Sequence, residues 1–354
     1  MVGDIKSILV YSPSWLGDAV ISLAALRSLR THYPDARITV LARSWVVDLY
    51  KACEAVDDTL EYDHLGTHKG PLGFLRLVAL LREPKFDLAL LFPNAFRAAA
   101  VVWAARIPNR WGYGTDGRTS FLTRVAPPAP RPFGRHQVYY YLDLLRDLGI
   151  PTGAPDNRLH LTTEMKGQAH DLLTRNGWKD RQPLVGIHPG ATNSSAKRWF
   201  PTRYAEVGDR LADLLGGRVV LLGGPQEQAL TQEILDSMRT PAIDLSGQTS
   251  LEELMGVLET FAVFVTNDSG PMHIAAALGT PTLAVFGPTD ERETGPIGQA
   301  SGIVRKEVHC SPCLFKECPT DHRCMHEVGV DDVVQRATEL LGKKTKSGAR
   351  EAVS

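Results

Sequence analysis

The sequence has 354 residues, of which 43% are hydrophobic and 22% charged, as expected for a globular protein. At roughly 100–200 residues per domain, this length predicts two domains rather than one. Lys and Arg number 39 against 40 Asp and Glu, which argues against nucleic-acid binding driven by overall positive charge. No apolar run approaches the roughly 18 residues that span a bilayer, and we find no signal peptide, so we expect a cytoplasmic protein.

The positive charge is concentrated in one part of the chain. Residues 69–140 contain eleven basic side chains against three acidic ones, a local excess of +8. One interpretation is a solvated surface. The other is a face that attracts a polyanion or the anionic surface of a membrane, and it predicts a peripheral membrane contact.

Strand and helix patterns alternate along the first part of the chain. Continuous apolar runs predict buried strands, and apolar residues three or four apart predict helices. In chain order these are strand 7–11, helix 19–29, strand 37–41, helix 74–81, strand 88–92, helix 95–105 and helix 137–148.

A polar segment at 149–161, with two prolines and two glycines, interrupts this alternation and is typical of a linker. The alternation then resumes with strand 184–188, helix 203–215, strand 218–222, helix 226–238, strand 261–266, helix 271–278, strand 282–286 and helix 331–341.

Apolar strands separated by helices indicate parallel sheets that are covered on both faces. We therefore predict an α/β protein with two Rossmann-like, doubly wound domains facing each other across a cleft. The predicted boundaries are 1–160, 161–342 and a flexible tail at 343–354. Because ligands of such folds bind at the carboxyl ends of the strands, the residues after each strand are the candidate site.

The first strand leads into Ser12-Pro13-Ser14-Trp15-Leu16-Gly17-Asp18. Asp18 falls in the first helical turn, where the helix dipole favours a carboxylate and should lower its pKa. The alternative to this structural role is a general base that acts on a sugar hydroxyl. The motif is not G-x-G-x-x-G, which argues against a nicotinamide-binding protein.

The strand at 184–188 leads into His188-Pro189-Gly190-Ala191-Thr192-Asn193-Ser194-Ser195-Ala196-Lys197-Arg198-Trp199. Backbone N–H groups and hydroxyls of this small-residue loop can donate to a diphosphate, and Lys197 offsets its charge. The G-K-[ST] spacing of a Walker A loop is absent. After the next strand, Glu227 is placed to accept hydrogen bonds from a ribose diol, or it is simply an acidic residue in a first helical turn.

The polar turn Thr266-Asn267-Asp268-Ser269-Gly270-Pro271-Met272-His273 follows a buried strand and opens a helix. The N–H groups of Ser269 and Gly270 are predicted to bind an anion, and Asp268 to bind sugar hydroxyls. Two structural alternatives are that Ser269 is an ordinary N-cap and that His273 is a core histidine.

Four cysteines are spaced C-x2-C-x4-C-x5-C: Cys310, Cys313, Cys318 and Cys324. In a cytosolic protein such a cluster suggests a metal site, and we predict a structural zinc ion. Only the first pair has the close spacing that is usual for zinc. Disulfides or redox pairs, and free thiols, remain as alternatives.

These blocks resemble the ADP-heptose:lipopolysaccharide heptosyltransferases, glycosyltransferase family 9. The resemblance lies in P-S-W-L-G-D at 13–18, H-P-G-A at 188–191, K-R-W at 197–199 and T-N-D-S-G-P-M-H at 266–273, extended by F-G-P-T at 286–289. The P-S-W-x-G-D form is most like the heptosyltransferase II branch, which adds the second inner-core heptose.

The resemblance implies a GT-B fold, an ADP-heptose donor and an anionic heptosyl-Kdo-lipid A acceptor. It makes Asp18 the base, Lys197 a phosphate ligand and Glu227 the ribose ligand. It also places Thr192 and Asn193 with Ser269 and Gly270 at the donor phosphates, and Asp268 and His273 at the donor sugar.

We therefore predict an inverting heptosyltransferase in which Asp18 deprotonates the attacking hydroxyl, with no cofactor required for catalysis. The alternatives are heptosyltransferases I or III with another acceptor, a GT-B sugar-nucleotide epimerase, and a non-catalytic binding protein.

Overall fold

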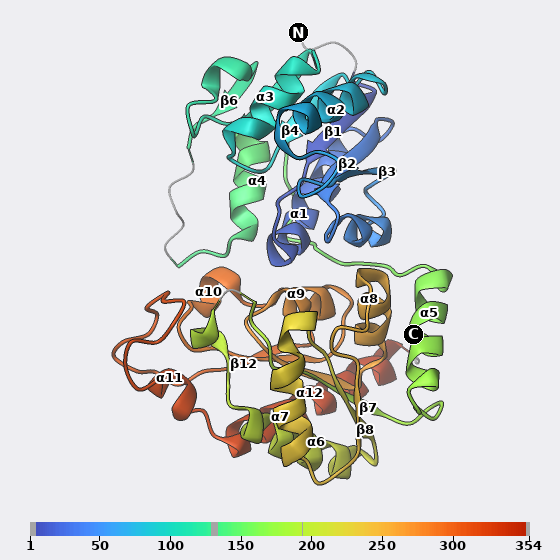
Figure 1. Ribbon diagram of the computed structural model, residues 1–354, viewed down its shortest axis with the longest axis vertical. Helices are drawn as coiled ribbons and strands as arrows, with labels where there is room; N and C mark the ends of the chain where they lie inside the picture. The colour runs from blue at the N-terminus through green and yellow to red at the C-terminus, as the bar shows by residue number, and fades with distance from the viewer. Residues whose placement is uncertain (1–4, 129–133, 193, 352–354) are drawn as a thin grey trace. The chain divides into compact units, whose positions relative to one another are not determined.

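The computed structural model describes residues 5–128, 134–192 and 194–351, with side chains as far as residue 342. The chain divides into two compact units, residues 1–160 and 161–354, called unit 1 and unit 2 below. In each unit, helices cover both faces of one sheet (Figure 1). This confirms the predicted α/β class with two Rossmann-like units. Within the described residues, no helix is long and apolar enough to cross a bilayer.

Unit 1 contains a parallel six-stranded sheet with the order β3-β2-β1-β4-β5-β6. Its strands are β1 (Ser7–Tyr11), β2 (Arg37–Arg43), β3 (Asp58–Tyr62), β4 (Leu88–Leu91), β5 (Asn109–Tyr113) and β6 (Arg124–Ala126). Its helices are α1 (Leu16–His32), α2 (Gly70–Arg82), α3 (Phe96–Ala104) and α4 (Val138–Asp147), with 3-10 turns at η1 (Val47–Ala52) and η2 (Thr119–Phe121).

The two faces of this sheet are buried under different helices. Leu9, Ala89 and Leu91 share a core with side chains of α2 and α3, while α1 and α4 pack together on the opposite face. Because neighbouring residues of a strand point to opposite faces, both faces must be apolar. This explains the uninterrupted apolar runs of β1 and β4.

Unit 2 has the same architecture, with the order β12-β11-β10-β7-β8-β9. Its strands are β7 (Leu184–His188), β8 (Arg218–Leu221), β9 (Ala242–Asp244), β10 (Val263–Asn267), β11 (Thr282–Val285) and β12 (Ser301–Val304). The helices are α5 (Thr163–Arg175), α6 (Pro201–Leu215), α7 (Gln228–Ser237), α8 (Leu251–Thr260), α9 (Gly270–Ala277), α10 (Glu291–Thr294), α11 (Arg323–His326) and α12 (Val330–Glu351), with η3 (Ser195–Lys197) and η4 (Pro225–Glu227).

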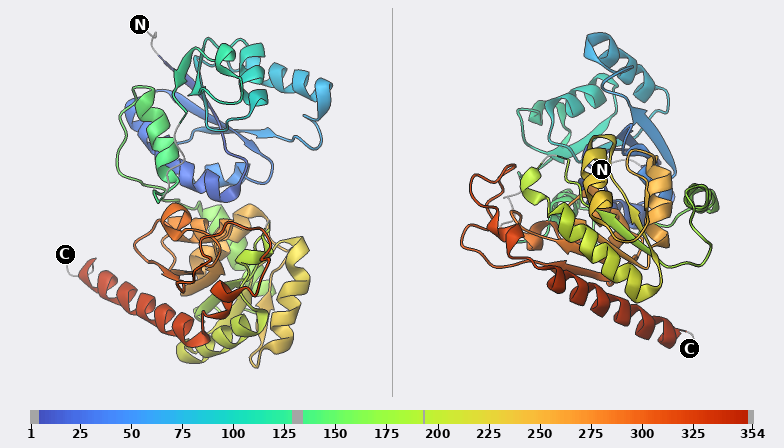
Figure 2. Two further views of the ribbon diagram at one scale, coloured as in Figure 1. Left: turned by 90° about the vertical axis from the view of Figure 1, so that its left-hand side faces the viewer. Right: turned by 60° about the horizontal axis from the view of Figure 1, so that its bottom comes forward.

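Helices α6, α7 and α12 contribute to the main core on one face of the second sheet. Helices α8 and α9 pack together, and α5 packs against α8. The last helix continues over residues 343–351 as far as Glu351, beyond its predicted end (Figure 2). The predicted helix ended at residue 341 because the apolar spacing stops there.

Both sheets have the strand order 3-2-1-4-5-6 when the strands of each unit are counted from its own first strand. In this order the chain direction across the sheet reverses between the first and fourth strands. The loops after those two strands separate and leave room for a ligand. The reversal lies between β1 and β4 in unit 1, and between β7 and β10 in unit 2.

Candidate functional site

The reversal point of unit 2 brings together two of the predicted blocks. The loop after β7 carries residues 189–199 and the turn after β10 carries residues 268–270, while β7 and β10 pair directly, with Thr266 opposite His188. The loop after the neighbouring strand β8 carries Glu227, at the end of η4. Three polar loops that are far apart in the sequence therefore meet at one edge of the sheet.

Asn267, the last residue of β10, holds two of these loops together. Its side-chain oxygen accepts hydrogen bonds from the Trp199 backbone N–H at 3.1 Å and the Tyr204 hydroxyl at 2.7 Å. Its amide nitrogen donates to the Pro189 carbonyl at 2.6 Å. Asn267 is fully buried, so these bonds are protected from water. We infer that Asn267 positions the loop rather than contacting a ligand.

Lys197 and Asp268 form an ion pair at this edge. The Lys197 Nζ lies 2.7 Å from Oδ2 of Asp268, and the Thr289 hydroxyl donates to the same oxygen at 2.8 Å. The Asp268 side chain is buried, whereas Lys197 is partly exposed. The pair leaves the ammonium group at the surface of the site, where it can approach an anion.

Glu227 is a buried carboxylate with one oxygen left available. Its Oε2 accepts a hydrogen bond from the Gly224 N–H at 2.8 Å and lies 3.6 Å from Nε2 of His188. Its Oε1 is buried and has no hydrogen-bond partner in the described structure. Burial alone would raise the pKa of Glu227. The hydrogen bond and charge of His188, the hydrogen bond from the Gly224 N–H and the charge of Arg198 outweigh burial and hold the pKa below its usual value. The group is thus an ionised acceptor.

Ser269 does not act as an N-cap, in contrast to the structural alternative. No side-chain capping hydrogen bond forms at the start of α9. Instead, its hydroxyl contacts the Thr266 hydroxyl at 3.1 Å and lies 3.4 Å from Nδ1 of His188. The first N–H groups of a helix have no intrahelical acceptor, so those that begin at Gly270 can bind an anion. His273 is buried within α9.

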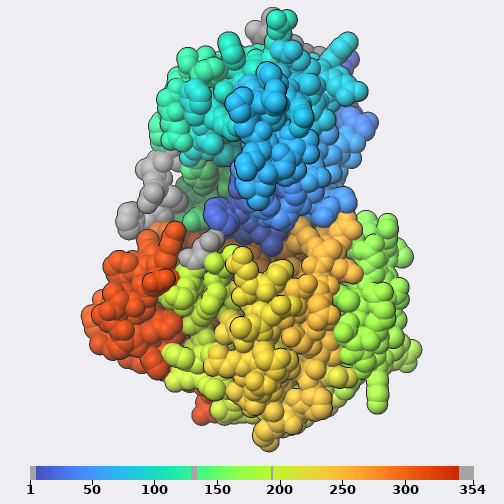
Figure 3. All heavy atoms as spheres, in the orientation of Figure 1, coloured from blue at the N-terminus to red at the C-terminus, as the bar shows by residue number. Residues whose placement is uncertain are grey.

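The cysteine segment packs against the loop after β7 (Figure 3). The Lys316 carbonyl accepts hydrogen bonds from the Ala196 N–H at 3.1 Å and the Ser194 hydroxyl at 3.1 Å. His322 Nε2 lies 2.7 Å from the Ala196 carbonyl. Thr192 lies in the same loop, exposed to solvent, whereas Asn193 falls outside the described residues. The segment thus supports the backbone that leads to Lys197.

The structure gives no support to a zinc ion at the cysteines. All five cysteines are free thiols, so the disulfide alternative is wrong. No group of three or more His, Cys, Asp or Glu side chains is arranged to hold a metal ion within the described ranges. Burial, together with the nearby Cys310, Cys313 and Cys318, raises the pKa of Cys324 to about 11. The sequence spacing predicted proximity of the cysteines but not ligand geometry.

Asp18 lies in unit 1, in the first turn of α1 after the carboxyl end of β1, and is partly buried. Burial and then the charge of Asp18 raise the pKa of Tyr141 well above its usual value. The pKa of Tyr50 is also raised, mainly by burial, and the charge of Asp18 makes the smallest contribution. The carboxylate therefore lies among tyrosine rings at the reversal point of the first sheet.

Sequence reasoning missed three residues of the unit 2 site. These are Asn267, Thr289 and Arg198, whose charge acts on Glu227. Asn267 and Thr289 lie within the quoted motifs, and Arg198 follows the predicted phosphate ligand directly. The motifs pointed to these residues, but only the fold shows which contacts they make.

A family model described as glycosyltransferase family 9 (heptosyltransferase) matches residues 74–323. The chain belongs to glycosyltransferase family 9. It is therefore a glycosyltransferase, and the family expected from the motifs is confirmed.

Individual relatives agree with this family. The chain is 32% identical to lipopolysaccharide heptosyltransferase 2 of Escherichia coli K12, covering 84% of this chain and 87% of the relative. It is 31% identical to lipooligosaccharide heptosyltransferase 2 of Haemophilus influenzae, covering 95% of this chain and 100% of that relative. The solved E. coli ADP-heptose lipopolysaccharide heptosyltransferase II superposes with a TM-score of 0.81 at 27% identity. The match covers 96% of this chain and 100% of the solved one. This likeness supports the GT-B architecture.

Proposed function

We propose that this family 9 glycosyltransferase moves a heptose from ADP-heptose to the inner-core heptose of heptosyl-Kdo2-lipid A during lipopolysaccharide core synthesis. ADP-heptose stands in the name of the solved E. coli enzyme, and lipopolysaccharide and heptosyl transfer stand in the names of both E. coli proteins. The observation that carries the donor half of the proposal is the buried, unpartnered Oε1 of Glu227 at the same sheet edge as the partly exposed Lys197.

Each part of the donor has a proposed partner. Glu227 accepts hydrogen bonds from the ribose hydroxyls. Lys197, Thr192, Asn193 and the N–H groups of Ser269 and Gly270 bind the diphosphate. Asp268 and His273 bind the donor sugar. Because Lys197 already pairs with Asp268, the donor can place its phosphate and its sugar on adjacent members of one ion pair.

The proposed reaction is a single displacement with inversion at the anomeric carbon. Asp18 takes the proton of the acceptor hydroxyl while the hydroxyl oxygen forms a bond to the anomeric carbon. The bond between that carbon and the departing ADP breaks at the same time. Lys197 and the N–H groups around 269–270 stabilise the charge that grows on ADP. These donors are fixed before the reaction, so we expect no requirement for an added cofactor or divalent cation.

The acceptor is an anionic lipid, so we propose that unit 1 contacts it at the cytoplasmic face of the inner membrane. The support is the excess of basic side chains in residues 69–140. Opposite charges raise the local concentration of the acceptor near this unit. Unit 1 is then the acceptor-binding domain and unit 2 the ADP-sugar-binding domain.

An ADP-release assay with and without heptosyl-Kdo2-lipid A tests the proposal. We expect release of ADP and formation of the diheptosyl product only when the acceptor is present. Conversion of the donor without acceptor would indicate an epimerase instead. Binding of ADP-heptose without any turnover would indicate a non-catalytic binding protein.

Asp18→Asn tests the proposed base in the same assay. The amide keeps the shape of the side chain but accepts no proton, so we expect kcat to fall by about 10²–10⁴-fold with the donor Kd largely unchanged. Near-full activity of this variant would remove Asp18 from the mechanism.

A further inference from the structure

Two arginines of unit 1 lie against the ring of one tyrosine at the carboxyl edge of the sheet. Arg43 ends β2 and Tyr62 ends the neighbouring strand β3, whereas Arg97 belongs to α3. The guanidinium carbons lie 4.4 Å (Arg43) and 6.0 Å (Arg97) from the centroid of the Tyr62 ring. The ring can hold both cations through its negatively polarised faces.

Neither arginine has an acidic partner. Within the described residues, no carboxylate lies within ion-pair distance of either guanidinium group, although most other arginines of unit 1 outside residues 69–140 form ion pairs. Arg43 Nη1 and Arg97 Nε are buried and lack hydrogen-bond partners. Where the structure describes its surroundings, Arg97 donates one hydrogen bond, from Nη2 to the His68 carbonyl at 3.0 Å. The two charges thus share one aromatic ring and have no counter-charge among the described side chains.

Asp63, which follows Tyr62 in the chain, is already engaged by backbone hydrogen bonds. Asp63 accepts hydrogen bonds from the N–H groups of Gly66 and Thr67 at 2.9 and 2.7 Å. These bonds lower the pKa of Asp63. A rotation of Asp63 toward the arginines would give up both of them, so the protein does not supply the missing negative charge at low cost.

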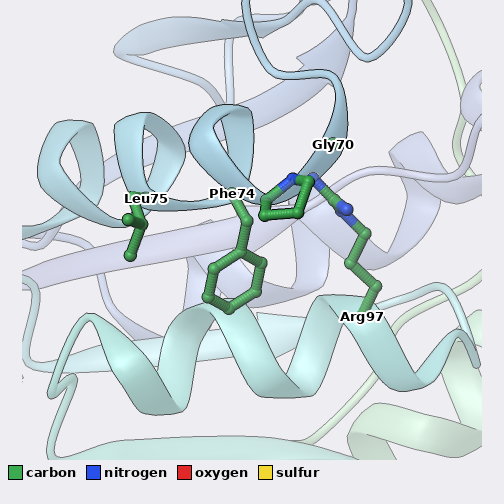
Figure 4. Close-up of a pocket in the computed structure, with 5 residues that line it drawn as sticks. Gly70, Phe74, Leu75 and Arg97 are labelled. Atoms are coloured by element: carbon green, nitrogen blue, oxygen red, sulfur yellow. The ribbon is translucent and has the colours of Figure 1, made fainter.

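Space for a ligand lies beside Arg97. A cavity of about 520 Å³ is lined by Gly70, Pro71, Phe74, Leu75 and Arg97. Arg97 extends from α3 toward the start of α2, and Phe74 lies between the two helices (Figure 4). The cavity wall is mostly apolar and bears the arginine at one end. Such a site suits an amphiphile with an acid group.

Of the two arginines, Arg43 adjoins the loop that carries Asp18. Arg43 Nε lies 3.5 Å from the Ser14 hydroxyl, and Trp45 Nε1 donates to the Ser14 carbonyl at 3.0 Å. A ligand held by Arg43 is therefore next to the P-S-W-L-G-D loop. This is where the acceptor must be bound if Asp18 is the base.

We propose that Arg43 and Arg97 form a subsite for an acid group of the acceptor, either a carboxylate of its sugar acids or a phosphate of its lipid. Both groups match the forked N–H donors of a guanidinium. Partly buried charges without partners are costly, and this cost is relieved when the ligand supplies the opposite charge. The assignment rests on the proposed transfer to a lipopolysaccharide acceptor and adds the residues that select it.

The test combines Arg43→Gln and Arg97→Gln with three acceptors: heptosyl-Kdo2-lipid A, its carboxyl-reduced form and its dephosphorylated form. Arg175→Gln is the matched control, because Arg175 is an exposed arginine of α5 with no ion pair to a described carboxylate. Acceptor KM, donor KM and kcat are measured, together with the acceptor Kd by calorimetry on the full chain, which needs no turnover.

We expect each variant to raise the KM and Kd for the unmodified acceptor by about 10–100-fold, the effect of losing a charge-assisted hydrogen bond. Donor KM and the control should be unchanged. The acceptor that lacks the recognised acid group should bind weakly to the wild type and equally weakly to the variants, which identifies the carboxylate or the phosphate. Because no carboxylate neutralises these arginines, Tm of the variants should stay at or above that of the wild type.

The subsite would be overturned if the variants weakened binding of all three acceptors equally, or of none of them. It would also be overturned if the wild-type Kd were the same for the unmodified, carboxyl-reduced and dephosphorylated acceptors. Transfer of heptose by the wild type decides the proposed function separately. If the wild type transfers heptose and both variants bind every acceptor with the wild-type Kd, the subsite is refuted while the proposed function stands.

Discussion

Gly190 shows how a single missing side chain shapes the donor site. A Cβ at this position would overlap Oε1 of Glu227, the oxygen that we assign to the ribose. Gly190 has no unusual backbone angle that calls for glycine, so space rather than conformation requires it. The sequence marked Gly190 only as part of a small-residue loop, and the steric reason for this glycine comes from the fold.

Gly190→Ala is expected to weaken ADP binding by about tenfold or more, because either the loop or the Glu227 carboxylate must move. Calorimetry with ADP measures the change. Gly153→Ala is the control, since a Cβ there meets nothing within 4 Å. An unchanged Kd in the Gly190 variant would separate Glu227 from the nucleotide.

Asn267 connects the β7 loop to the β10 turn through buried hydrogen bonds. Asn267→Ala leaves the Trp199 N–H, the Tyr204 hydroxyl and the Pro189 carbonyl without partners. An unsatisfied buried polar group costs about 1–3 kcal/mol, and such costs are only partly additive, so we expect the free energy of unfolding to fall by about 3 kcal/mol.

Urea unfolding of unit 2 measures this loss. Tyr204→Phe removes only one of the three bonds, and about 1 kcal/mol is expected. Equal effects of the two substitutions would mean that the links to the β7 loop do not contribute to stability.

At the scale of elements, the sequence predicts the central strands and misses the edges. β1 and β7 match their predicted bounds, because both faces of these strands are buried and most of their residues are apolar. β3 and β6 carry exposed, charged residues and give no such signal. Helix α5 was missed since only four of its thirteen residues are buried. Helix α8 did show a signal, the Ser250–Glu253 capping box.

Helix α6 is joined to the segment after α7 by Asp209. Its carboxylate accepts from the N–H groups of Arg239 and Thr240 at 2.9 and 3.0 Å and from the Thr240 hydroxyl at 2.7 Å. Burial alone would raise its pKa, but these hydrogen bonds lower the pKa below its usual value. The folded state thus binds this proton less tightly than the unfolded state.

It follows that Asp209 stabilises the fold fully above the unfolded-state pKa of about 3.9, and that this contribution is lost as the pH falls through the lower folded-state value. Asp209→Asn should reduce the free energy of unfolding at pH 7 by about 1.5–3 kcal/mol. The difference from wild type should shrink between pH 5 and pH 3. Asp213→Asn, one turn later and exposed, should show little effect at either pH, as urea unfolding can measure.

At the scale of the molecule, two sheets have the same strand order and thus the same kind of ligand position. The sequence supplied the alternation of strands and helices, and hence two doubly wound units, but not the order of the strands. It also showed which polar loops follow strands. It could not show that Lys197 pairs with Asp268, because that contact depends on the pairing of β7 with β10, which are separated by about 80 residues. The cysteine spacing misled for a different reason, because closeness in the sequence does not fix the geometry that a metal ion requires.

This arrangement predicts where ADP acts on the whole chain. A ligand that binds only the folded state stabilises the segments it contacts, by about 2.7 kcal/mol at 100 times its Kd. Hydrogen exchange of the full chain with saturating ADP should therefore slow at the loops after β7, β8 and β10. The loops after β1 and β4 should exchange as before, because we assign the acceptor to unit 1. Glu227→Gln at the same ADP concentration should reduce the protection by weakening the ribose contact. Slower exchange in the loops of unit 1 with none in unit 2 would reverse the assignment of donor and acceptor to the two units.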